Sequence, residues 1–112
     1  MMWIRGRLSA GFAEFSLVPH ETIEVQESGY LLTRPNGSQN LLLHHELCSV
    51  EVLNRGEVFF LLNGSNTSIV VSHDAQGAGP LLAHLQKLPG FDSAAVVQAM
   101  ADEGQHLCWK KS

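Results

Sequence analysis

The chain has 112 residues, of which 45% are apolar and 16% are charged, and its formal net charge is −4. This length is that of a single domain, and an apolar content near the globular average excludes a disordered chain. The 7 Lys and Arg residues are scattered among 11 Asp and Glu residues, whereas binding to nucleic acid by charge requires clustered basic residues. We therefore expect no nucleic acid as a partner.

Three further features indicate where in the cell the protein is located. Val58–Leu62 is among the longest apolar runs, and it is far shorter than the roughly 20 residues that a membrane-spanning helix needs. Residues 1–7 lack the apolar stretch of a secretory signal. Cys48 and Cys108 are too few for a disulfide scaffold. These features predict a cytoplasmic protein.

Turn signals divide the first two-thirds of the chain into short segments. Asn, Gly, Ser and Pro residues gather at 27–29, 35–37, 54–56 and 63–66, where they favour tight turns. A spacing of roughly 8–12 residues between such signals is typical of an antiparallel β-fold. We predict seven strands, over 12–18, 21–26, 30–34, 39–44, 47–53, 57–62 and 67–72.

Alternating apolar residues indicate which face of each strand turns inward, because successive side chains on a strand point to opposite faces. The expected inward sets are Ile23 and Val25; Cys48, Val50 and Val52; Val58, Phe60 and Leu62; and Ile69 and Val71. The alternation predicts sheets with one buried face.

The spacing becomes helical after the last of these strands. Four leucines form one stripe of a helix that opens near Pro80, since Pro suits the first helical turn. They are Leu81, Leu82, Leu85 and Leu88. We expect this stripe to face the sheet, and the neighbouring His84 to turn more toward water.

A second, shorter helix is predicted over 93–101. Asp92 precedes it as a good N-cap, because its carboxylate can accept a free backbone N–H of the first turn. Val96, Val97 and Met100 form its expected apolar side. The residues that follow, 106–109, form either a last strand or a docked tail.

Seven strands followed by a helix, together with one residue pattern, resemble the bacterial pleckstrin-homology-like domains. The pattern comprises the strand, turn and strand of Ile23–Leu31, the polar corner and apolar strand of Leu43–Val52, and the helix Pro80–Leu85. The resemblance implies a strongly bent, seven-stranded antiparallel barrel that is closed at one end by the C-terminal helix. The fold class is therefore expected to be mostly β.

The resemblance also implies a domain organisation. The whole chain, 1–112, would be one pleckstrin-homology-like domain, with a core over about 12–88 and a helical tail over about 89–112. Members of this group mostly bind peptides, proteins or lipid head groups. The phosphoinositide-binding members carry several basic residues around the first hairpin loops, where this chain has only Arg34. We therefore expect no phosphoinositide binding at a membrane.

These features favour a non-enzymatic binding module that mediates protein contacts or self-association. Trp3, Arg34 and Trp109 are the candidate interface residues, because an exposed Trp near either terminus marks an interface. The alternative is a binder of a small apolar or lipid-like ligand, held in the barrel or beside the C-terminal helix.

Histidines and a cysteine gather in the middle of the chain, at His44, His45 and Cys48, and His73 and His106 are further imidazoles. Imidazole and thiolate are zinc ligands, but a closed zinc site takes four ligands. Adjacent residues on a strand also point to opposite faces. We expect no metal and no other cofactor.

Two other segments hold residue types that occur in active sites. Ser72–Asp74 contains those of a hydrolase triad, but three consecutive side chains cannot align in relay. Gly77–Gly79 lacks the Lys and Ser or Thr that follow the glycines of a nucleotide-binding loop. Cys108 lies between Leu107 and Trp109, which favours a structural thiol over a reactive one. We expect no catalytic residue.

Overall fold

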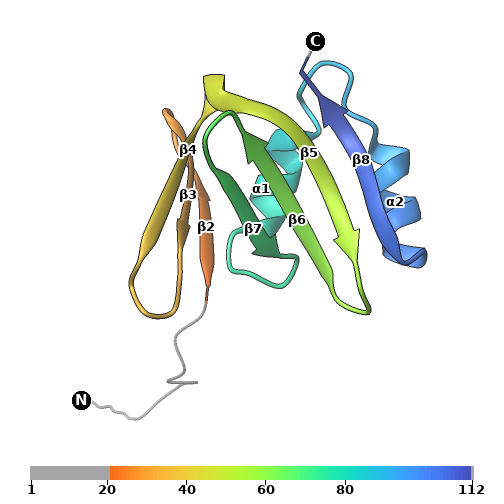
Figure 1. The fold of residues 1–112 in the computed structure, drawn as a ribbon, viewed down its shortest axis with the longest axis horizontal. Helices are drawn as coiled ribbons and strands as arrows, with labels where there is room; N and C mark the ends of the chain where they lie inside the picture. The colour runs from red at the N-terminus through yellow and green to blue at the C-terminus, as the bar shows by residue number, and fades with distance from the viewer. Residues whose placement is uncertain (1–20, 112) are drawn as a thin grey trace.

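The computed structural model describes residues 21–111, so the strand expected over 12–18 lies outside the described residues. Figure 1 shows the arrangement of the elements. In chain order they are β2 (Thr22–Val25), β3 (Gly29–Thr33), β4 (Gln39–Leu43), the 3-10 helix η2 (His44–Glu46), β5 (Leu47–Asn54), β6 (Val58–Gly64), β7 (Ser68–Ser72), α1 (Ala78–Leu85), α2 (Ser93–Ala101) and β8 (Gly104–Lys110). The other six predicted strands and both helices are confirmed, and the expected last strand or tail is the strand β8.

The strands form two antiparallel sheets rather than one barrel. The three-stranded sheet has the order β2-β3-β4, and the four-stranded sheet has the order β7-β6-β5-β8. The prediction of a closed seven-stranded barrel is wrong for the part of the chain that the structure describes. The reason is that β5 leaves β4 through the corner η2 and then pairs with β6 on one edge and β8 on the other. Neither edge of β5 remains to pair with the three-stranded sheet.

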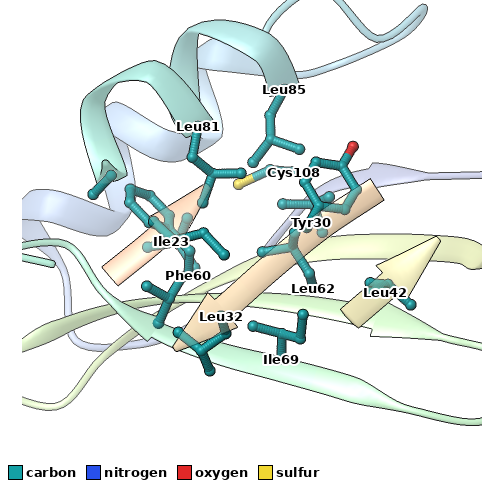
Figure 2. Close-up of a cluster of buried hydrophobic side chains, with 14 of the residues drawn as sticks. Ile23, Tyr30, Leu32, Leu42, Phe60, Leu62, Ile69, Leu81, Leu85 and Cys108 are labelled. Atoms are coloured by element: carbon teal, nitrogen blue, oxygen red, sulfur yellow. The ribbon is translucent and has the colours of Figure 1, made fainter. Parts of the chain in front are cut away.

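Both helices lie on one side of the four-stranded sheet (Figure 1). Helix α1 packs against β2, and α2 packs against β8 and β5. Figure 2 shows the buried side chains that α1 and the two sheets contribute, among them Ile23, Tyr30, Phe60, Leu62 and Leu81. The main core therefore lies between the inner face of the four-stranded sheet, the three-stranded sheet and α1. No helix within residues 21–111 is long and apolar enough to cross a membrane.

The alternation rule places most of this core correctly. Val58, Phe60 and Leu62 are all buried, as the alternation along β6 predicts. The rule fails at Cys48, which is exposed. The pairing of β5 with β6 shifts by one residue just after Leu47, and this irregularity gives Leu47 the buried position.

Helix α2 is rotated relative to its predicted orientation. Its buried residues are Val96 and Ala99, whereas Val97 and Met100 are exposed. The predicted apolar side is therefore right only at Val96. The small side chain of Ala99 lets the backbone of α2 approach β5, where the side chain of Asn54 donates a hydrogen bond to the carbonyl of Ala99.

Asn54 is buried, and its substitution provides a first testable prediction. Its Nδ2 donates to the carbonyl of Ala99 at 2.7 Å, and its Oδ1 accepts from the N–H of Gly56 at 3.0 Å. Asn54→Ala leaves both backbone groups without these bonds, so we expect the free energy of unfolding to fall by about 1–3 kcal/mol in urea titration. Asn63→Ala, which removes hydrogen bonds between partly exposed side chains, is the matched control. An equal loss from both variants would contradict a pinning role for Asn54.

Candidate interaction surface

The face of the four-stranded sheet that is turned away from the helices carries contiguous apolar side chains. We call them the outer apolar face; they are Leu53 on β5, Phe59 and Leu61 on β6, Val70 on β7 and Leu107 on β8. Cross-strand pairing brings neighbours together, because Leu61 lies opposite Val70 and Phe59 lies opposite Leu53. These pairs join β5, β6 and β7 in one apolar surface, and Leu107 on β8 lies opposite Glu51 at its border.

Two of these side chains are strongly exposed. Val70 is 48% exposed and Leu107 is 51% exposed, and the other three are partly buried. In Figure 1 both helices lie behind the sheet, and nothing within residues 21–111 covers the front. Contiguous exposed apolar surface on a folded domain marks an interaction site, whereas single exposed apolar residues do not.

Polar groups occupy defined places on the same face. The carboxylate of Glu51 accepts from Nε2 of Gln105 at 2.5 Å and from Nδ2 of Asn63 at 3.5 Å. Asn63 also donates to Oγ of Ser49 at 3.0 Å. Lys110 pairs with Ser49 across β5 and β8 and is exposed, so it lies at the margin of this face. The face thus combines apolar side chains with one carboxylate and one ammonium group.

The structure does not bring the predicted interface residues together. Trp3 lies outside the described residues. Arg34 follows β3, and its guanidinium donates to the side chain of Asn40. The indole N–H of Trp109 donates to the carbonyl of Pro89 at 2.9 Å, which fastens β8 to the linker between the helices. Arg34 and Trp109 lie apart from the outer apolar face, and their part in an interface stays a prediction.

A register shift explains why Trp109 lies on the helix-covered side. The pairing of β5 with β8 is irregular between Val50 and Glu51, so Cys108 and Trp109 both turn toward the core. Cys108 is almost fully buried. Burial, followed by the charge of Asp92, raises the pKa of its thiol to about 11. A thiol of this kind stays protonated near neutral pH, which is the setting of a structural cysteine.

The other chemically distinctive residues are spread over the fold. His45 and Cys48 are exposed, and His44 is partly buried on η2. His73 follows β7 and His106 lies on β8, at opposite edges of the four-stranded sheet. Within residues 21–111, no three His, Cys, Asp or Glu side chains are placed to share a metal ion.

The Ser72–Asp74 segment forms a turn. The hydroxyl of Ser72 accepts from the N–H of Asp74 at 3.2 Å, and Nδ1 of His73 lies 3.4 Å from the Asp74 carboxylate. A shallow hollow of about 170 Å³ lies beside this turn, lined by Glu21, Ser72, Asp74 and Ala75. The hydroxyl therefore serves the turn, and the hollow has two carboxylates in its wall.

Three aromatic rings from separate elements meet in one cluster, a group that the sequence does not predict. Tyr30 comes from β3, His44 from η2 and His84 from α1. Nε2 of His84 lies 3.1 Å from the Tyr30 hydroxyl, and the two residues are 54 positions apart in the chain. His84 turns more toward water than the fully buried Leu85, as predicted, but its ring is also partly buried against Tyr30.

No family model, curated protein or solved structure matches this chain. The outer apolar face and the aromatic cluster are therefore interpreted from their own geometry and chemistry. Of the two, the outer apolar face is the more exposed, and it is the candidate contact surface.

Proposed function

We propose that the chain is a non-enzymatic protein-binding module of the pleckstrin-homology-like kind, and that it associates with a second copy of itself through the outer apolar face. The observation that carries this proposal is the set of apolar side chains that all four strands present on this face, which is uncovered within residues 21–111. Burying apolar surface contributes roughly 25 cal/mol per Å². Association through this face would therefore remove from water the apolar surface that the fold leaves exposed.

The charges on the face favour a second copy over an arbitrary partner. Glu51 lies on β5 and Lys110 on the neighbouring strand β8. A two-fold symmetric contact uses the same patch twice. A two-fold axis in the plane of the interface, midway between Glu51 and Lys110, places the carboxylate of each copy over the ammonium group of the other. Such pairing matters because Gln105 and Asn63 give the Glu51 carboxylate hydrogen bonds but no opposite charge, and burying an uncompensated charge is costly.

The order of the elements supports the pleckstrin-homology-like assignment. A three-stranded antiparallel sheet is followed by β5, β6 and β7 in a second sheet, and then by the helix α1. The alternative of a small apolar ligand has less support. The hollow beside Ser72 includes the side chains of Glu21 and Asp74, whereas sites for apolar ligands have mainly apolar walls.

Sedimentation equilibrium tests the proposal on the full chain. We expect a reversible dimer whose fraction rises between about 1 µM and about 500 µM, the range in which micromolar dissociation constants are measured. Leu107→Lys and Val70→Lys should shift the chain to monomer and keep its melting temperature, because both side chains are about half exposed. Val97→Lys, on the exposed side of α2, is the matched control and should leave the dimer intact.

Charge reversal tests the proposed symmetry. Glu51→Lys and Lys110→Glu should each weaken the dimer, and the double variant should restore it, because the exchanged charges again face each other across the interface. A chain that stays monomeric throughout the concentration range would overturn self-association. A dimer that persists in Leu107→Lys and Val70→Lys would overturn the choice of this face.

A further inference from the structure

The aromatic cluster of Tyr30, His44 and His84 fastens α1 to the three-stranded sheet. The ring of Tyr30 meets the other two edge-on, with centroids 4.8 Å from His44 and 5.5 Å from His84. The two imidazoles stack on each other with centroids 5.2 Å apart and an angle of 27° between the ring planes. Tyr30 is only 1% exposed. Figure 2 shows it among the buried side chains below α1. The cluster therefore connects three elements at the boundary of the core.

The hydrogen-bond partners assign the protons of this cluster. Nε2 of His44 lies 2.8 Å from the carbonyl oxygen of Gln26, which only accepts, so this nitrogen carries a proton and donates. Burial raises the pKa of Tyr30 to about 12, so its hydroxyl stays protonated. A neutral His84 can accept that proton at Nε2. Within residues 21–111, the bond to His84 is the only side-chain hydrogen bond of the Tyr30 hydroxyl.

Protonation of His84 reverses this arrangement. A charged imidazole donates from both nitrogens and accepts at neither. Nε2 of His84 would then donate to the hydroxyl oxygen of Tyr30, and the hydroxyl proton would have to turn away and lose its acceptor. A buried donor without an acceptor is destabilising. The charge would also lie against the stacked ring of His44. Both effects weaken the contact between α1 and β3.

The surroundings that shift the pKa of His84 all disfavour its positively charged form. Its pKa is lowered from its ordinary value by burial first, and then by His44 on η2 and Lys87 just after α1. Two carboxylates on the elements that carry the cluster or pack against α1 are hydrogen-bonded within their own segments. That of Glu46 on η2 accepts from the N–H of Leu43 at 3.3 Å, and that of Glu24 on β2 accepts from the side chain of Gln26 at 3.1 Å.

We propose that the contact of His84 with Tyr30 and His44 is a pH-sensitive junction, which holds α1 on the three-stranded sheet when His84 is neutral and loosens when His84 is protonated. The sign follows from linkage. The unfolded chain binds a proton at His84 near its ordinary pKa of about 6.5, and the folded chain binds it only at lower pH. The stabilisation by neutral His84 is therefore complete above about pH 6.5, the ordinary pKa. It is lost as the pH falls below that value and through the lower pKa of the folded chain.

Two measurements on the full chain test the junction. In an NMR titration, the ring of His84 should titrate below the ordinary value of about 6.5. Hydrogen exchange, corrected for intrinsic rates, should show protection falling in α1 more than in α2 between about pH 7.5 and about pH 5, the range in which histidines titrate. A ring that titrates at or above its ordinary value would overturn the proposal. This titration needs no variant, so it decides even where a variant fails to fold.

The variant His84→Gln separates the junction from other effects of acid. Its amide oxygen can still accept from Tyr30 but takes up no proton in this range. The urea midpoint of the unmodified chain should fall more on acidification than that of His84→Gln. The exposed neighbour of the cluster provides the control, since His45→Gln should keep the pH dependence of the unmodified chain. Equal pH dependence in the unmodified chain and in His84→Gln would refute the junction.

Discussion

Leu85→Ala should lower the free energy of unfolding by about 2–5 kcal/mol, the range measured when a buried leucine is truncated in a packed core. Leu85 is completely buried on α1, in the same cluster as Leu81 and Tyr30 (Figure 2). The truncation leaves a cavity that two sheets and a helix cannot readily fill. Because whole domains are stable by only about 5–15 kcal/mol, the loss should be plain in the urea midpoint.

The neighbouring residue offers a control for this variant. Gln86 is exposed at the end of α1, so Gln86→Ala should leave the midpoint nearly unchanged. If α1 were an arm that packs only on a partner, both variants would leave the stability of the isolated chain alone. Equal and small effects would therefore contradict a core that includes α1.

Local features of the fold follow from short stretches of sequence. Asp92 was predicted as the N-cap of α2, and its carboxylate accepts from the N–H of Ala95 at 3.1 Å. The turn at 35–37 and the strands on either side of it also lie where Pro, Asn and Gly place them. These features depend on backbone preferences and on neighbours within about four residues, which is why the sequence pattern is sufficient to find them.

Features that depend on distant contacts do not follow in this way. Periodicity identifies an apolar stripe on α2 but not its rotation, which the bond from Asn54 to Ala99 sets across 45 residues. The division into two sheets depends on β8 pairing with β5, and nothing within either segment specifies its partner. The contact of His84 with Tyr30 also joins residues that are 54 positions apart, so neighbouring residues do not predict it.

One signal for the candidate surface is present in the sequence. Val58–Leu62 is apolar at every position rather than at alternate ones. A strand with this pattern has apolar side chains on both faces, which is typical of strands that are covered on both. In the structure Phe60 faces the core, and Phe59 and Leu61 lie on the outer apolar face. An uninterrupted run in an otherwise alternating sheet thus indicates a contact surface, although the paired residues of β7 and β8 become apparent only from the register.

Gly77→Ala should be among the most destabilising single substitutions in the chain, with an expected loss of at least about 3 kcal/mol from backbone strain and overpacking together. Gly77 is the N-cap of α1 and has φ of +94°, a conformation that side chains disfavour. A Cβ atom at this position would lie 1.9 Å from the carbonyl oxygen of Ile23. That oxygen cannot easily move, because the N–H of Ile23 bonds the carbonyl of Gln76 at 2.8 Å and holds β2 beside the loop.

Two other glycines separate the two causes in the same urea titration. Gly37 has φ of +90° with nothing within 4 Å of an added Cβ, so Gly37→Ala should show the backbone strain alone, about 1–2 kcal/mol. Gly56 has φ of +86°, again with nothing within 4 Å of an added Cβ, so Gly56→Ala should show a similar loss from backbone strain alone. The excess loss of Gly77→Ala over Gly37→Ala then measures how closely the start of α1 approaches β2. If the two variants lose the same amount, α1 does not begin against Ile23, and the packing of α1 on the three-stranded sheet is wrong.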